Sequence, residues 1–271
     1  MSIFLSDNYG KNDPFFQQRK EVEKNLENVK TIIAVHSGKG GVGKSTFSIN
    51  FAAALSKKDF QVGLLDADLD CPSLHLMSGI NDRVLVNEFG RFIPLTTSFG
   101  LKVISVGNMV ESNSIANIMR GPIMFKLIFD MLSKTEWQNL DFLIIDLPPG
   151  TNDNPLTIMQ LVNLDGLIIV TQPQKAALFD AEKSFDMAKK MNVRVLGVVE
   201  NMSSEIFGQG TAREIASKYR IPFLGTILLD KRIRETSDKG LPAVLEYQDL
   251  LENFEVIIKN LNENLLKFRK Q

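Results

Sequence analysis

The sequence predicts an α/β fold, with a doubly wound, mostly parallel sheet and helices on both faces. Seven short runs rich in Val, Ile and Leu show no alternation with polar residues, which is typical of strands that helices cover on both sides. Amphipathic stretches separate these runs, and alternating strands and helices favour parallel strands joined by right-handed crossovers. The predicted strands span residues 31–35, 62–66, 101–106, 142–146, 166–170, 194–199 and 222–227.

Helices are predicted between the strands and towards both ends of the chain. Residues 1–12 are polar and are expected to be loose, and a small β-excursion is expected around Gly90 within residues 84–96. No internal repeat or linker interrupts the pattern, so residues 1–271 are expected to form a single domain. The predicted helices span residues 14–30, 44–58, 119–134, 176–190, 211–219 and 247–270.

Composition narrows the class of protein. The chain is 44% hydrophobic and 23% charged, as in an ordinary globular protein with a sizeable core. Its net charge of −1 gives no global attraction to nucleic acid or to an anionic membrane. The single cysteine, Cys71, excludes a disulfide within the chain and fits a reducing compartment. No secretory signal or membrane span is visible, so a cytoplasmic protein is expected.

A phosphate-binding loop is predicted at GKGGVGKS, residues 38–45, which fits the pattern G-x-x-x-x-G-K-[ST]. The loop follows the first predicted strand and opens a helix, where backbone N–H groups and the helix N-terminus favour phosphate. Lys44 is expected to reach the β- and γ-phosphates, Ser45 to ligate Mg²⁺ and Thr46 to contact the α-phosphate. The predicted ATP-binding residues of this segment are Gly38, Lys39, Gly40, Gly41, Val42, Gly43, Lys44, Ser45 and Thr46.

Carboxylates follow two other predicted strands. Phosphoryl transfer needs such groups to hold magnesium and to orient water. Asp146 ends the run FLIID and is expected to take a magnesium-bound water, and the PPGT that follows predicts a stiff switch that senses the γ-phosphate. Asp66 and Asp68 follow VGLL two residues apart, so they point the same way. We expect Asp68 to position the attacking water and Asp66 to support magnesium, whereas Asp70 is as well explained as a cap of the next segment.

These motifs resemble the deviant Walker-A ATPases of the ParA/MinD superfamily, and within it the Mrp/ApbC group of iron–sulfur cluster carriers. The resemblance rests on KGGVGKS with its extra Lys39, followed by DAD and DLPPGT. RGP at 120–122, VTQPQ at 170–174 and ENMS at 200–203 also match, and the matching phrases run in order over residues 27–245. The resemblance therefore covers about four-fifths of the chain, and it implies the ParA/MinD-like form of the predicted fold.

The resemblance implies a slow, Mg²⁺-dependent ATPase that works as a homodimer with two ATP molecules between facing subunits. In such dimers the residue matching Lys39 crosses to the partner's phosphates, where it supplies the charge that an arginine finger supplies elsewhere. The catalytic residues are then Lys39, Lys44 and Asp68. Asn201 is expected to contact the adenine edge, or else to pack at a strand end, and Pro173 with Gln174 is expected to line the base pocket.

One part of the family pattern is missing. In the carriers, ENMS is followed by a loop with a C-x-x-C pair, and two such pairs hold one cluster between subunits, whereas here Ser203 runs directly to Phe207. An iron–sulfur cluster is therefore doubtful as a cofactor. Cys71 is expected to be an incidental small residue, the alternative being a metal site that the two Cys71 residues of a dimer form with His75 or Asp70. His36 and His75 are expected to be structural.

Three functions remain open at this point. The first is iron–sulfur cluster assembly or carriage, with a client or assembly protein as partner. The second is a MinD-like positioning ATPase, for which the helix over 247–270 offers an apolar face and basic end residues suited to a membrane surface, although packing as the final helix of the domain explains it as well. The third, a metabolic P-loop kinase, is disfavoured by the two lysines of the loop.

Overall fold

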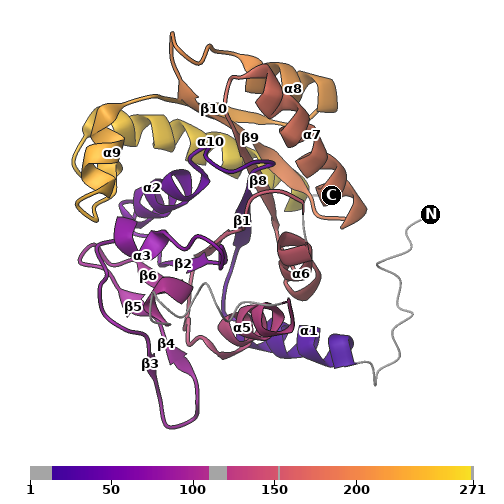
Figure 1. Cartoon of the computed structure of the whole chain (residues 1–271), viewed down its shortest axis with the longest axis vertical. Helices are drawn as coiled ribbons and strands as arrows, with labels where there is room; N and C mark the ends of the chain where they lie inside the picture. The colour runs from indigo at the N-terminus through magenta and orange to yellow at the C-terminus, as the bar shows by residue number, and fades with distance from the viewer. Residues whose placement is uncertain (1–13, 110–120, 152, 270–271) are drawn as a thin grey trace.

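An eight-stranded sheet forms the centre of the computed structural model, which describes residues 14–109, 121–151 and 153–269 (Figure 1). The predicted loose segment 1–12 lies outside these residues. The strand order is β10-β9-β8-β1-β7-β2-β6-β5, and every neighbouring pair is parallel except the edge pair β5–β6. The strands are β1 (Ile32–His36), β2 (Val62–Asp66), β5 (Leu95–Thr96), β6 (Lys102–Ser105), β7 (Phe142–Asp146), β8 (Gly166–Thr171), β9 (Val195–Ser203) and β10 (Phe223–Leu228).

All seven predicted strands are present, and the predicted doubly wound sheet is confirmed. Strands β1, β2, β7 and β8 are buried along their whole length, which explains why their sequences lack polar alternation. The largest difference from the prediction is β9, which continues beyond residue 199 to Ser203 and so carries the ENMS motif inside the sheet.

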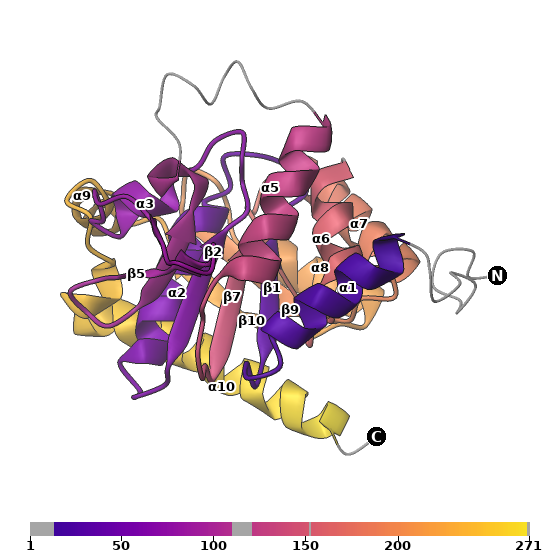
Figure 2. The same cartoon turned by 90° about the horizontal axis from the view of Figure 1, so that it is seen from below.

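Helices cover both faces of the sheet (Figure 2). One hydrophobic core lies under α1, α5, α6, α7 and α8, and a second lies under α2 and α10. Helix α1 ends before its predicted limit at residue 30, because Val29 leaves the helix to form a parallel bridge with Leu140. The helices are α1 (Pro14–Asn25), α2 (Lys44–Ser56), α5 (Gly121–Lys134), α6 (Asp153–Leu161), α7 (Lys175–Lys190), α8 (Thr211–Tyr219) and α10 (Gln248–Arg269).

Three described helices were not predicted: α3 (Leu74–Met77), α6 and α9 (Lys231–Ser237). They have nine residues or fewer, too few for a clear helical repeat of apolar positions. The β-excursion over 84–96 is a short hairpin of β3 (Leu85–Val86) and β4 (Phe92–Ile93), with Gly90 at φ 72° in its turn, followed by β5. Glycine adopts this left-handed conformation without steric cost.

The C-terminal helix α10 packs its apolar face onto the sheet. Phe254, Ile257, Ile258 and Leu261 are each at most 2% exposed and belong to the second core. Phe47 of α2 stacks on Phe254 with ring centroids 5.8 Å apart. No helix in the described part of the chain is long and apolar enough to cross a bilayer.

Candidate functional site

The predicted site residues lie at the carboxyl end of the central strands. Strand β1 leads into the phosphate loop, residues 38–45, and lies between β7 and β8. Val35 of β1 is in register with Asp146 of β7, and Asp146 is in register with Asp66 of β2. Ligands of open α/β sheets bind at this edge, where the strand order reverses. The topology thus brings Asp66 and Asp146 beside the loop, as predicted.

The phosphate loop is shaped by its glycines. Gly41 and Gly43 have φ of 77° and 81°, and a Cβ atom on Gly43 would lie 2.3 Å from the Asn201 Nδ2 atom. A Cβ on Gly38 would lie 1.9 Å from the Asp180 carbonyl oxygen of α7. Helix α2 begins at Lys44, and no side chain of the described residues caps its N-terminus. The loop therefore presents an uncapped helix end, which favours a bound anion.

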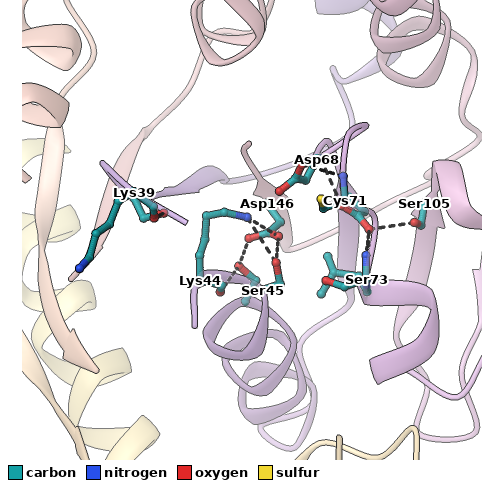
Figure 3. A network of polar contacts seen from close by, with 12 residues as sticks. Lys39, Lys44, Ser45, Asp68, Cys71, Ser73, Ser105 and Asp146 are labelled. Carbon is teal, nitrogen blue, oxygen red and sulfur yellow. Dashed lines mark hydrogen bonds and ion pairs between the residues drawn. The ribbon is translucent and has the colours of Figure 1, made fainter. Parts of the chain in front are cut away.

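Lys44 and Asp146 form a buried ion pair at the start of α2 (Figure 3). The Lys44 Nζ and Asp146 Oδ2 atoms are 2.7 Å apart, and the two side chains are 6% and 0% exposed. Ser45 and Ser48 donate to the same carboxylate from their hydroxyls, each at 2.6 Å. Two hydroxyls and an ammonium thus satisfy Asp146, and they fix Ser45 beside it.

Asp66 is satisfied differently, by one hydroxyl and by backbone N–H groups. The Ser105 hydroxyl donates to Asp66 Oδ2 at 2.8 Å, and the N–H groups of Ser73 and Leu74 donate to the same oxygen at 3.2 Å. The N–H of Asp68 donates to Oδ1 at 3.2 Å. Burial, and then the nearby negative charge of Asp146, raise the pKa of Asp66 to about 7. Asp66 therefore anchors the loop from Asp66 to Leu74 around its own carboxylate.

Asp68 and Cys71 lie in that loop. Asp68 is 8% exposed, and its Oδ1 atom accepts from the Cys71 N–H at 3.3 Å. Burial raises the pKa of the Asp68 carboxyl. Cys71 is exposed. Within the described ranges of a single chain, no three His, Cys, Asp or Glu side chains are grouped so as to hold a metal ion.

Lys39 is placed unlike Lys44. Its side chain is half-buried and extends away from the cluster around Asp146 (Figure 3). Its backbone carbonyl accepts from the Ser37 hydroxyl at 2.9 Å, and no ion pair of its ammonium is found among the described residues. The predicted second lysine is thus held at the loop by its backbone, and its ammonium extends away from Asp146.

Asn201 and Gln172 hold the phosphate loop from the side of β8 and β9. The Asn201 amide donates to the Val42 carbonyl at 2.8 Å, and the Gln172 amide donates to the Gly41 carbonyl at 3.1 Å. Met202, next to Asn201, has φ 58°, a strained value for a long side chain inside a strand. This contact of Asn201 with the phosphate loop was not predicted from the sequence.

Pro173 is buried, and its carbonyl accepts from the Thr211 hydroxyl at 2.6 Å, which ties the end of β8 to α8. Glu200, which the sequence analysis missed, is 1% exposed and accepts from the N–H groups of Gly210 and Ala212, both at 2.9 Å. It therefore caps α8 with a carboxylate. The available sequence signal was a glutamate at the end of an apolar run, eleven residues before the first residue of α8.

His36 ends β1 and is fully buried, as a structural residue would be. Burial, and then the positive charge of Lys44, lower the pKa of its imidazole to about 3, while the backbone carbonyl of Pro148 acts in the opposite direction. The ring is therefore neutral at neutral pH. Burial also lowers the pKa of His75, which is packed against Gly107.

The donor set at this edge of the sheet fits a nucleotide polyphosphate with Mg²⁺. The uncapped start of α2 and the Lys44 ammonium suit phosphate oxygens. The Ser45 hydroxyl lies 2.6 Å from Asp146, and Asp66 is the next carboxylate across the sheet. Magnesium prefers such oxygen ligands and usually keeps several waters and substrate phosphates in its shell.

A family model described as "ParA: NUBPL iron-transfer P-loop NTPase" matches residues 28–265. The chain belongs to this family. The chain is thus an NUBPL-type P-loop NTPase, and the resemblance to the Mrp/ApbC carriers and the ParA/MinD-like fold are confirmed.

Curated relatives of this NTPase cover most of its length. It is 45% identical over 244 residues to an iron–sulfur cluster carrier protein of Aquifex aeolicus, covering 86% of this chain and 67% of that one. It is 40% identical to the carrier of Methanocaldococcus jannaschii, with 92% and 90% covered. An Arabidopsis thaliana protein described as an iron–sulfur protein required for mitochondrial NADH dehydrogenase is also 40% identical, with 90% and 84% covered.

Solved structures agree on the fold. A nucleotide-binding protein of Archaeoglobus fulgidus in complex with ADP is 35% identical and superimposes with a TM-score of 0.75, covering 87% of this chain and 96% of that one. The cell-division ATPase MinD of Pyrococcus furiosus gives a TM-score of 0.70 at 24% identity, covering 87% and 99%. The likeness to MinD at this identity shows a shared fold only.

Proposed function

We propose that this NTPase is a slow, Mg²⁺-dependent ATPase that works as a cytoplasmic homodimer in iron–sulfur cluster assembly. The observation that supports it most is the buried Lys44–Asp146 pair with Ser45 at the uncapped start of α2, which suits a phosphate and its magnesium. Lys44 and Ser45 bind the phosphates and Mg²⁺, Asp66 and Asp146 hold the magnesium shell, and Asp68 positions the attacking water. The names of the relatives supply the iron–sulfur setting.

Lys39 completes the site of the facing subunit in this proposal. Its ammonium points away from its own Asp146 cluster, so a second copy is the natural recipient of its charge. Pro173, Gln174 and Asn201 form the base side of the pocket, beside the loop carbonyl that Asn201 already holds. Hydrolysis then requires two copies to come together across the nucleotides, so the binding and hydrolysis of ATP set how long the closed dimer lasts.

Mixing two inactive variants tests this arrangement. Lys39→Ala and Lys44→Ala are each expected to lack Mg²⁺-dependent phosphate release. In a mixed dimer, the Lys39→Ala subunit keeps its own Lys44 and receives Lys39 from its neighbour, so one of two sites is complete. With random pairing, an equimolar mixture should recover about one quarter of wild-type turnover per chain. No recovery in the mixture, or full turnover of Lys39→Ala alone, would contradict the shared site.

The cluster itself is proposed to be held mainly by a partner protein. Two copies of this chain offer only two thiolates, both Cys71, whereas iron–sulfur clusters commonly take four. Anaerobic reconstitution with iron and sulfide is therefore expected to leave the purified protein without a stable brown chromophore. A chromophore that survives desalting in the wild type and disappears in Cys71→Ser would show that the chain binds the cluster by itself.

The structure lends little to the alternative of a membrane-positioning ATPase. That function needs an apolar helix face free for lipid, but four apolar residues of α10 are packed on the sheet: Phe254, Ile257, Ile258 and Leu261. Wild-type protein with Mg²⁺ and ATP is expected to stay in the supernatant when anionic liposomes are sedimented.

A further inference from the structure

His36 is a buried polar residue whose ring nitrogens form no hydrogen bond of normal geometry with the described residues. It ends β1, directly before the phosphate loop, and its side chain is 0% exposed. Neither ring nitrogen has a hydrogen-bond partner among the described residues. The neutral imidazole has one N–H donor and one acceptor nitrogen, and burying both unpaired weakens a fold. Packing alone would be served better by an apolar side chain of similar size.

The ring lies against the loop that follows Asp146. This loop is joined to β1 on both sides of His36: the Leu147 N–H donates to the Val35 carbonyl and the Gly150 N–H donates to the Ser37 carbonyl, each at 2.9 Å. The Pro148 carbonyl is close enough to act on the imidazole, but no hydrogen bond of normal geometry joins them. An unused donor and a carbonyl acceptor therefore face each other beside the loop.

The same loop begins at the aspartate that holds Lys44 and Ser45. Pro148 and Pro149 have no N–H groups, so their backbone can only accept hydrogen bonds. A small shift of Pro148 would complete the bond to His36 and would be felt two residues away at Asp146. A ligand that binds the shifted loop more tightly would draw the molecule into that position.

We propose that His36 is a positioning residue of the ATPase: its ring N–H donates to the Pro148 carbonyl when ATP is bound, and this bond holds the Pro148–Gly150 loop in the position that completes the site. The inference rests on the proposed function, since it needs a nucleotide whose γ-phosphate meets the loop. It assigns to His36 a role in turnover and not in nucleotide affinity.

Ring NMR tests the bond without requiring hydrolysis. The chain has only two histidines, so ¹⁵N-histidine labelling with His75→Gln as the assignment variant identifies the His36 signals. Samples without nucleotide, with Mg²⁺-ADP and with a non-hydrolysable Mg²⁺-ATP analogue are compared. A slowly exchanging, downfield ring N–H signal is expected with the analogue only. Identical His36 signals in all three samples, at saturating nucleotide, would overturn the inference.

Turnover and stability together provide the second test. His36→Leu removes the unpaired nitrogens, so the nucleotide-free protein should melt at a higher temperature. Its kcat should fall about ten- to hundredfold, with the KM for ATP within about twofold of wild type. His36→Asn and His36→Gln keep an amide near Nδ1 and Nε2 respectively, and the one that restores kcat identifies the donor.

Two results of this second test would overturn the role of His36. One is a wild-type kcat in His36→Leu. The other is a joint fall of kcat and melting temperature that neither amide variant restores, because that pattern indicates a purely structural residue. If the wild-type protein binds no nucleotide, the proposed function fails first and this inference fails with it. If it binds the analogue but hydrolyses nothing, the NMR comparison still decides whether the bond forms.

Discussion

Asp146 and Asp66 lie side by side at the ends of neighbouring strands, yet the molecule neutralises them in opposite ways. Asp146 meets an ammonium and two hydroxyls from α2. Asp66 meets one hydroxyl and three backbone N–H groups and forms no ion pair with a described residue, and its pKa is raised to about 7. The Asp146 carboxylate is thus already paired with the lysine of the phosphate loop without a ligand. The Asp66 carboxylate has no such ion pair among the described residues, so a bound cation would stabilise its ionised form.

The largest effect on turnover and stability is expected when Lys44, the cation that pairs with Asp146, is replaced. Lys44→Met leaves Asp146 buried with two hydroxyls and no cation, so we expect turnover at background and a loss of roughly 3–5 kcal/mol in the free energy of unfolding. Urea unfolding and phosphate release measure both. Lys57→Met, at an exposed lysine at the end of the same helix, is the matched control and should stay within about 0.5 kcal/mol.

The double variant Lys44→Met/Asp146→Asn sharpens this prediction. It removes the uncompensated charge, so it should be more stable than Lys44→Met alone although equally inactive. Equal stability of Lys44→Met and wild type would mean that Asp146 does not need the ammonium, and the contrast with Asp66 would disappear.

The next effect concerns the charge of Asp66. The folded pKa of Asp66, about 7, lies above its ordinary value of 3.8, so between these two pH values the folded state keeps a proton that the unfolded state loses. The contribution of Asp66 to stability is therefore present at low pH and is lost as the pH rises towards 7. Asp66→Asn lacks this loss. Between pH 5 and pH 7 the stability of wild type relative to the variant should fall by about 2–3 kcal/mol.

Urea unfolding at several pH values in EDTA, without nucleotide, measures that difference. Subtracting the variant also removes the contribution of His36, whose lowered pKa of about 3 works the other way and makes stability rise with pH up to about 6.5. Parallel pH profiles of the two proteins would show that Asp66 is not protonated in the folded state. The ionised Asp66 carboxylate would then be as well stabilised in the folded protein as the Asp146 carboxylate.

The positions of the two carboxylates could be predicted from the sequence, because they depend on where the strands end. Apolar runs located β2 and β7, and parallel strands bring their carboxyl ends to one edge, so Asp66 and Asp146 were expected near Lys44 and Ser45. The glycine pattern likewise predicted the phosphate loop, which follows the first predicted strand and lies at the same edge of the sheet. These features depend on local composition and on one topological rule.

The partners of the two carboxylates were not predicted. Ser48 reaches Asp146 from one turn further along α2, and Ser105 reaches Asp66 across a strand pair that the sequence does not specify. Gln172 and Gly41 are 131 residues apart in sequence. The Gln172 amide reaches the Gly41 carbonyl only because β8 lies next to β1 in the sheet. Serines and glutamines are common and carry no spacing signal, so the strand order must be known before such contacts can be found.

The smallest effect separates the two serine hydroxyls. Ser48→Ala leaves Asp146 with Lys44 and Ser45, whereas Ser105→Ala leaves Asp66 with backbone N–H groups only. Each change should cost about 1 kcal/mol at pH 7. The Ser105 bond lowers the pKa of Asp66, so it is stronger when that carboxylate is ionised, and the cost of Ser105→Ala should be greater at pH 8 than at pH 5.

Ser48→Ala is the comparison, because it removes a hydroxyl from a carboxylate that the Lys44 ammonium already pairs. Unfolding of both variants at pH 5 and pH 8 in EDTA therefore compares the two carboxylates directly. Equal pH dependence would show that the ammonium of Lys44 does not distinguish them. A cost that rises with pH only in Ser105→Ala would locate the responsive charge of the site at Asp66, the carboxylate that anchors the loop carrying Asp68.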